Sequence, residues 1–208
     1  MRWVDRLYRH PFEGASARRY ARAERPAFGD LDDRLLDAIA PLLAGARTLL
    51  DVGCGPQTFA ARAVARHPDL SVIALDPSRD FARRGAASVL RAAAEALPLA
   101  TGSIDVATCV SSIRHVRDRA RALGELRRVV RPGGRLVIVE LDPAADALRI
   151  ANHADRLGSC LLRHAFGPLV VKTAPRERDI ARLASSHGWR AHTRHDDPVQ
   201  PVYILELA

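Results

Sequence analysis

Two carboxylates and a glycine-containing turn in this 208-residue chain have the types and spacing needed to hold a charged nucleoside. The apolar residues of LLDVGCGPQ (49–57) lead into Asp51, Gly53 and Gly55. Glycines let a ligand touch the backbone at such a turn, and the helix that follows presents unpaired N–H groups toward it. Asp76 follows a second apolar run about 20 residues later, where a carboxylate can accept both ribose hydroxyls of an adenosine ligand.

A nicotinamide dinucleotide is the main competing ligand for this turn. The dinucleotide pattern is GxGxxG, but its third glycine is replaced here by Thr58, which keeps the helix away from the pyrophosphate. Asp51 would also face a diphosphate poorly, whereas it suits a cation such as the amino group of a methionine moiety. Because two glycines alone are weak evidence, a turn that binds no ligand stays open as an alternative.

The elements around this turn alternate between apolar strands and amphipathic helices, which indicates βαβ units and a mostly parallel sheet. Right-handed crossovers then bring the carboxyl ends of the parallel strands to one edge, where ligands bind. The predicted strands are 48–52, 71–75, 88–92, 104–110 and 135–140, the last preceded by a stop at Pro132-Gly133-Gly134. The predicted helices are 31–42 (capped by Asp30), 59–66, 78–86 and 118–130.

The tail follows a different pattern. We predict a long helical stretch over 144–165, a helix from about 173 to 188, and strands at 189–195 and 202–207. Their connection is too short for a helical crossover, so one of these strands should run antiparallel. The predicted fold is α/β, a Rossmann-like, doubly wound, mostly parallel seven-stranded sheet with an antiparallel strand near the C-terminus. We predict one domain over 1–208, with an N-terminal helical lid (1–45), a cofactor-binding core (46–143) and substrate-side helices with the last two strands (144–208).

Four ordered motifs resemble class I S-adenosylmethionine-dependent methyltransferases over roughly residues 48–143. LLDVGCGPQ resembles their first motif, and IALDPS (73–78) resembles the second. AEALPL (94–99) with GSIDV (102–106), and LRRVVRPGGRL (126–136), are similar to two further segments. IRHVRD and ELDP also resemble segments of the ubiquinone and menaquinone biosynthesis C-methyltransferases. The resemblance implies S-adenosyl-L-methionine as cofactor.

The resemblance also implies which residues contact that cofactor. These are Asp51, Gly53, Cys54 and Gly55 at the methionine end, Asp76 and Pro77 at the ribose, Ala94, Glu95 and Ala96 at the adenine, and Val110 and Ser111 at the sulfonium and substrate. Two positions depart from the family pattern. Gln57 replaces a frequent third glycine, and Ala93 stands where Asp or Asn often meets the adenine amino group.

Methyl transfer needs reactants held in line, and a base helps when the nucleophile carries a proton. His115 is the first candidate for this base, because it follows the fourth strand at the ligand edge; a packing role is the alternative. Arg114 could orient an anionic or phenolic substrate, or lie in an exposed loop. Tyr8, Phe12 and Tyr20, with Phe28, offer an aromatic lid surface for a small apolar ligand, with core packing as the alternative.

No metal site is predicted. The three cysteines, Cys54, Cys109 and Cys160, form no CxxC pair, and reduced, mostly buried thiols are the expected state. Cys160 and His164 share a helix face, which we interpret as a pocket wall. The run from His192 to Asp197 favours a polar loop, although metal-assisted transfer to a catechol-type acceptor is an alternative.

The formal net charge is +8, and all but one of the 32 basic residues are arginine. These arginines are spread along the chain and interleave with acids, so a nucleic-acid partner is not expected. No segment suggests a membrane span or a secretory leader, and we expect a cytoplasmic monomer or homodimer. A small-molecule methyltransferase is the leading hypothesis. An RNA or protein methyltransferase, and a non-catalytic module that kept the fold, are the competing ones.

Overall fold

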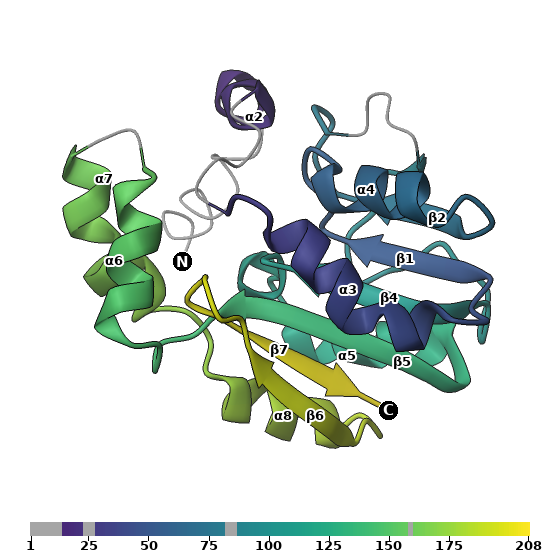
Figure 1. Ribbon diagram of the computed structural model, residues 1–208. Coiled ribbons are helices and arrows are strands. Elements are labelled where there is room, and N and C mark those ends of the chain that lie inside the picture. The colour runs from purple at the N-terminus through teal and green to yellow at the C-terminus, as the bar shows by residue number, and fades with distance from the viewer. Residues whose placement is uncertain (1–13, 23–27, 82–86, 158–159) are drawn as a thin grey trace.

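The computed structural model describes residues 14–22, 28–81, 87–157 and 160–208. Its strands form a single seven-stranded sheet in the order β3-β2-β1-β4-β5-β7-β6, with helices on both faces (Figure 1). The strands are β1 (Thr48–Val52), β2 (Ser71–Leu75), β3 (Ser88–Leu90), β4 (Ile104–Val110), β5 (Val130–Leu141), β6 (Ala191–Asp196) and β7 (Val202–Leu207). The helices are α2 (Gly14–Arg22), α3 (Leu31–Leu43), α4 (Thr58–Arg66), η2 (Ile113–His115), α5 (Arg119–Val129), α6 (Ala147–Asp155), α7 (Cys160–Ala165), η3 (Phe166–Val171) and α8 (Glu177–Ser185).

The strands β3, β2, β1, β4 and β5 are parallel, and β7 runs antiparallel to both β5 and β6. This confirms the predicted mostly parallel sheet and its antiparallel strand near the C-terminus. β1 lies between β2 and β4, so the loops after β2 and β4 lie on opposite sides of the turn that follows β1. This arrangement, a topological switch point, is where sheets of this kind bind ligands.

Alternation along the buried strands explains the two layers of helices. Leu49 belongs to the apolar cluster under α3 and α4, whereas Leu50 belongs to the cluster under α5 and α8. Successive side chains of a strand point to opposite faces, so a continuous apolar run such as β4 fills both clusters. α3 and α4 therefore cover one face of the sheet, and α5 and α8 cover the other (Figure 1).

Three predicted strands, 48–52, 71–75 and 104–110, are confirmed to the residue. The helix predicted over 78–86 is wrong for residues 78–81, which form a turn; residues 82–86 lie outside the described part of the chain. Local side-chain hydrogen bonds explain the turn. The Asp76 carboxylate accepts the Ser78 N–H (2.8 Å), and the Ser78 hydroxyl accepts the Asp80 N–H (3.2 Å), so these donors are satisfied without a helix.

Three further features differ from the prediction, besides shifts of up to four residues at the ends of other elements. The Asp30 side chain makes no capping hydrogen bond and instead pairs with Arg34. Residues 132–134 lie inside β5, which begins at Val130 and has a shift in its register with β4. The helical stretch predicted over 144–165 is divided into α6 and α7, and a π-helical segment, η3, follows.

No helix in the described ranges combines the length and the apolar character needed to cross a membrane.

Candidate cofactor-binding site

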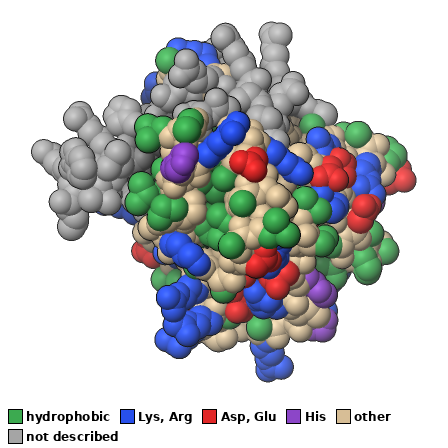
Figure 2. All heavy atoms as spheres, turned by 60° about the vertical axis from the view of Figure 1, so that its left-hand side comes forward, with side chains coloured by type: hydrophobic (Ala, Val, Ile, Leu, Met, Phe, Trp, Pro, Cys, Tyr) green, Lys and Arg blue, Asp and Glu red, His purple; other side chains and the backbone are tan. Residues whose placement is uncertain are grey.

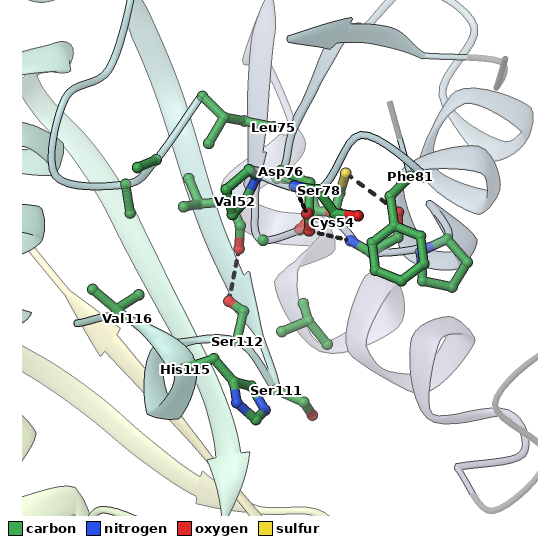
Figure 3. A pocket seen from close by; sticks show the side chains of 18 of the residues that line it. Val52, Cys54, Leu75, Asp76, Ser78, Phe81, Ser111, Ser112, His115 and Val116 are labelled. Carbon is green, nitrogen blue, oxygen red and sulfur yellow. Dashed lines mark hydrogen bonds between the residues drawn. The ribbon is translucent and has the colours of Figure 1, made fainter. Parts of the chain in front are cut away.

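A pocket of about 440 Å³ opens at the carboxyl ends of β1, β2 and β4 (Figure 3). Its walls come from the turn after β1, the loops after β2, β3 and β4, and Tyr20 of α2. This volume is within the range of sites that bind small molecules. The pocket therefore lies at the edge where the sequence predicts the ligand.

The turn after β1 is held by close backbone packing. The N–H groups of Gly53 and Cys54 both donate to the Leu75 carbonyl, at 2.7 and 3.0 Å. Gly53 has φ +72°, and a Cβ added there would lie 2.5 Å from the Cβ of Ser112. The Ser112 hydroxyl in turn donates to the Val52 carbonyl (2.7 Å; Figure 3). Glycine is therefore required at position 53 by both conformation and space.

Asp76 follows β2 and is 6% exposed. One carboxylate oxygen accepts the Gly55 N–H (2.9 Å) and the other accepts the Ser78 N–H (2.8 Å). Burial raises the pKa of Asp76, and these two hydrogen bonds act in the opposite direction. A carboxylate has about four acceptor positions, so each oxygen keeps capacity for one more donor. The arrangement suits two neighbouring hydroxyl groups.

Asp51 lies within β1 and is also buried. The Thr108 hydroxyl of the neighbouring strand β4 donates to it (3.1 Å). Because Asp51 and Asp76 line one pocket from adjacent strands, they place two acidic groups around a ligand that carries positive charge.

The backbone next to Asp76 is open where a ligand would approach. Gly55 has φ +51°, and a Cβ built on it would meet no described atom within 4 Å. Gln57 also has a positive φ, +64°, a backbone conformation that favours glycine. Its side-chain amide donates to the Phe81 carbonyl (3.0 Å) and it does not line the pocket. Gln57, where the family pattern has glycine, therefore supports the loop after β2 through this hydrogen bond. Ala93, the other departure, does line the pocket.

The loop after β4 forms the opposite wall. Ser111 has φ +53°, and its N–H donates to the Val139 carbonyl (2.7 Å). His115 lines the same pocket at the end of η2. Its ring is partly open to solvent, yet its pKa is lowered to about 4. The surrounding protein withdraws water from the ring, and the cations of Arg114 and Arg119 oppose further positive charge. His115 is therefore neutral near pH 7.

The loop after β3 contributes Ala94 and Glu95 to the pocket, whereas Ala96 is not among the lining residues. One oxygen of Glu95 accepts the N–H groups of Arg117 and Asp118, both at 3.1 Å. Glu95 thereby joins the loops after β3 and β4 just before α5 begins. The role of Ala96 beside the adenine is thus not supported by its position.

Arg114 does not line the pocket, which argues against the predicted role in orienting a substrate. Its guanidinium lies 3.8 Å from the fully buried carboxylate of Glu140 and donates to the Val170 carbonyl (2.8 Å). Burial raises the pKa of Glu140, and Arg114 opposes that change. Arg114 therefore connects the loop after β4 to η3.

The predicted lid is described only in part. Tyr8 and Phe12 lie outside the described residues, whereas Tyr20 lines the pocket and contacts Phe81, with 6.2 Å between ring centroids. The first residue of α2, Gly14, donates its N–H to Asp80 (2.6 Å), and Arg18 pairs with the same carboxylate (3.0 Å). Asp80 thus anchors α2 to the loop after β2.

The remaining candidates are the possible metal ligands and the Cys54 thiol. Within the described ranges, no group of three or more His, Cys, Asp or Glu side chains could hold a metal ion. His192 and His195 lie on the exposed strand β6, and the buried Asp197 pairs with Arg34. Burial raises the pKa of the Cys54 thiol, followed by the charges of Asp51 and Asp76, so this pocket residue is not a thiolate.

Several residues that the sequence did not single out also line the pocket. They are Phe59, Ser78, Phe81, Arg91, Ser112, Val116 and Arg117. Ser78, Val116 and Arg117 lie within the quoted motifs, and the others lie near a motif without a distinctive spacing of their own. Val110 and Pro77 were predicted and do line the pocket.

The fold and this pocket together define a Rossmann-like protein with a nucleoside-binding pocket at the carboxyl ends of its parallel strands. A sequence profile of the family described as "Methyltransferase domain" matches residues 50–138. The chain is 30% identical over 182 residues to a ubiquinone/menaquinone biosynthesis C-methyltransferase from Syntrophotalea carbinolica, covering 78% of this chain and 76% of that protein.

Other relatives are matched over less of their length. An uncharacterized 37.1 kDa transposon protein from Streptomyces fradiae is 38% identical over 153 residues, which are 69% of this chain and 44% of that protein. A demethylmenaquinone methyltransferase from Thermus thermophilus is 37% identical over 106 residues, 47% of this chain and 48% of that protein. The chain therefore spans less than half of the length of these two proteins.

Solved structures support the fold. A possible histamine N-methyltransferase from Thermotoga maritima has a TM-score of 0.60 at 23% identity, covering 92% of this chain and 93% of that one. A methyltransferase from Aquifex aeolicus has a TM-score of 0.62 at 16% identity, with 85% and 88% covered. The chain belongs to the S-adenosylmethionine-dependent methyltransferases.

The pocket fits the cofactor of this family. Asp76 has acceptor capacity for two ribose hydroxyls, and the open space beside Gly55 leaves room for the sugar. Asp51 supplies an acidic group beside the turn, which suits the amino group that the methionine part of the cofactor carries. These two acceptor groups thus suit a nucleoside that carries positive charge, and they would repel a diphosphate.

Proposed function

We propose that this chain transfers a methyl group from S-adenosylmethionine to a small-molecule acceptor through oxygen, nitrogen or an activated carbon. The observation that supports this best is the pair of buried carboxylates, Asp51 and Asp76, on adjacent strands around one glycine turn. Proteins with similar sequences or folds are named as C-, O- and N-methyltransferases. The similarity therefore does not identify the atom that is methylated.

In this proposal Asp76 binds the ribose hydroxyls, and Asp51 with the turn at Gly53 and Gly55 orients the methionine part. When bound, S-adenosylmethionine supplies an electrophilic methyl group on a sulfonium. Ala94 and Glu95 border the adenine, and Val110 and Ser111 border the sulfonium. His115, neutral near pH 7, accepts a proton from the acceptor at a ring nitrogen. Tyr20 helps to exclude water, which strengthens the electrostatic contacts inside the pocket.

The proposed partner is a small molecule and not a nucleic acid. Many described arginines pair with acids, which leaves their charge locally balanced. Arg34, Arg62, Arg66, Arg128, Arg131, Arg135, Arg149 and Arg194 are of this kind. On the face that carries α6 and α7, basic and acidic side chains occur together with hydrophobic ones (Figure 2). A surface that binds nucleic-acid phosphates would instead gather Lys and Arg side chains on one face.

We also propose that the protein is cytoplasmic and that it is a monomer or a homodimer. Cys54, Cys109 and Cys160 are all free thiols, as is usual in a reducing compartment. Size-exclusion chromatography with light scattering would give the number of subunits.

Calorimetric titration tests the proposed function directly. We expect saturable one-site binding of S-adenosylmethionine and of its demethylated product, S-adenosylhomocysteine, and little binding of NAD. Absence of saturable binding of either sulfur compound would indicate a degenerate fold. Tighter binding of NAD would show that the turn holds a pyrophosphate.

A further inference from the structure

The segment that contains α6, α7 and η3 exposes large apolar side chains to solvent. Leu148, Leu161 and Leu169 are 70%, 78% and 67% exposed, and Val170 is also exposed. In the rest of the described chain, only Tyr20 is an exposed large hydrophobic residue, and it lines the pocket. Single apolar side chains are normal on a surface, whereas a concentration of them in one segment marks an interaction site. We call Leu148, Leu161, Leu169 and Val170 the apolar patch.

The apolar patch is not needed for the packing of this segment. The three helices contact one another, and their inner side contributes Ala154, Phe166 and Val171 to the apolar cluster under α3 and α4. The Phe166 ring also stacks on the buried ring of His153, with 4.3 Å between the ring centroids. Hydrophobic side chains are visible on the outer face that carries α6 and α7 (Figure 2). The patch is therefore available to a partner.

Cations without acidic partners accompany the patch. The side chains of Arg163 and Lys172 donate to backbone carbonyls, at 3.0 and 2.6 Å, and neither forms an ion pair within the described residues. A carbonyl satisfies the donor but does not cancel its charge. Residues 147–172 hold four Lys or Arg and one acid, and only Arg149 among these cations pairs with an acid, Asp146. The segment therefore carries net positive charge.

This combination favours the surface of an anionic lipid bilayer as the partner. Apolar side chains enter the boundary between headgroups and acyl chains, and cations beside them attract anionic headgroups. A second copy of the chain fits less well, because a twofold interface would bring the positively charged patch against itself. Nucleic acid also fits less well, since phosphates would leave the exposed leucines in water.

We propose that the outer side of α6, α7 and η3 binds reversibly to anionic lipid membranes. Leu161 and Leu169 enter the interface, while Arg163 and Lys172 contact the headgroups. The protein is then held at the membrane surface and does not cross it. This binding does not depend on the proposed function, because none of these four residues lines the pocket.

Co-sedimentation of the full chain with lipid vesicles tests this proposal. The mixed vesicles contain phosphatidylcholine with about one third phosphatidylglycerol, and the neutral vesicles contain phosphatidylcholine alone. We expect saturable binding to the mixed vesicles and about tenfold weaker binding to the neutral ones. Added salt should weaken binding to the mixed vesicles, because it screens the attraction between the cations and the headgroups.

The apolar contribution is tested by the double variant Leu161→Ser with Leu169→Ser. It should bind the mixed vesicles about tenfold more weakly than wild type, since two side chains no longer leave water. Both leucines are exposed, so thermal stability and affinity for S-adenosylhomocysteine should stay close to wild type. These two measurements separate a lost membrane contact from a damaged fold.

The charge contribution is tested by Arg163→Gln with Lys172→Gln, which should weaken binding to the mixed vesicles about tenfold and leave the neutral vesicles unaffected. The matched control is Arg121→Gln with Arg190→Gln. It removes the same charge from exposed positions on α5 and before β6, and should change binding less than about threefold.

A reporter at the patch shows which surface meets the lipid. The indole of Leu161→Trp should emit at shorter wavelength on mixed vesicles than in buffer, after subtraction of the wild-type signal. No binding to the mixed vesicles, or binding that the leucine double variant leaves unchanged, would overturn the proposal. A dimer in light scattering that the same variant converts to a monomer would overturn it in favour of a second copy.

Discussion

The loops on the two sides of β1 are built differently. After β2, the carboxylates of Asp76 and Asp80 and the hydroxyl of Ser78 all accept backbone N–H groups. After β4, Ser111 is strained and its hydroxyl has no partner in the described structure. The first loop is satisfied before a ligand arrives, and the second keeps an unsatisfied group at the pocket. In the proposed function the loop after β2, which we call the nucleoside half of the pocket, is a preformed platform for the cofactor, and the loop after β4, which we call the acceptor half, borders the methyl acceptor.

The largest expected effect comes from the contact that joins the two halves. Gly53→Ala should lower the free energy of unfolding by about 3 kcal/mol, since the new Cβ is strained and overlaps Ser112. Urea denaturation measures this change. Gly45→Ala, at φ +83° in open space, is the control for strain alone and should cost about 1–2 kcal/mol. If the two variants are equally unstable, the inferred overlap between a Cβ at position 53 and Ser112 is wrong.

A second test acts on the nucleoside half alone. Asp76→Ala should weaken S-adenosylhomocysteine binding by about 2 kcal/mol, roughly 30-fold, because two hydroxyls lose their acceptor. Calorimetry measures the affinity, and thermal denaturation shows whether the loop still folds. Asp69→Ala, on an exposed turn before β2, should leave the affinity unchanged. Unchanged affinity in Asp76→Ala would mean that the ribose lies elsewhere.

The anchor of α2 offers a smaller effect. Asp80→Ala removes the acceptor for Gly14 and Arg18, so amide hydrogen exchange in α2 should accelerate about fivefold, near 1 kcal/mol. Arg18→Ala, which removes only the exposed pair, should have a weaker effect. Affinity for S-adenosylhomocysteine should change less than in Asp76→Ala. Exchange in α2 that does not change would show that other contacts hold the helix.

The smallest effect concerns His115 and pH. Its folded-state pKa, about 4, lies below the ordinary value of 6.5, so the unfolded chain binds more protons between these two values. Stability should therefore rise with pH from about 4 to 6.5, and this contribution should be lost as pH falls through that window. Comparing unfolding of wild type and His115→Gln at pH 4.5, 5.5 and 7 isolates it. Parallel curves would show that the ring titrates normally.

The sequence predicted the nucleoside half better than the acceptor half, for a physical reason. Asp51 lies in the last two residues of β1, and Gly53 and Asp76 directly follow strands, so the pattern that predicts the strand also places the residue. The position of Arg114 depends on Glu140 and Val170, which are distant in the chain, and no local pattern indicates that pairing. The turn at 78–81 was missed because side-chain acceptors replaced the helical bonds that the composition favours.

The lack of space between Gly53 and Ser112 has a consequence for engineering the protein. A loop transplanted from another methyltransferase to replace 111–117 brings a Cβ at its second position unless that residue is glycine, so the recipient's turn must keep glycine at position 53. A recipient with a larger residue at position 53 would have to move one of the two loops. Changing the acceptor by exchanging that loop is therefore a two-site design problem.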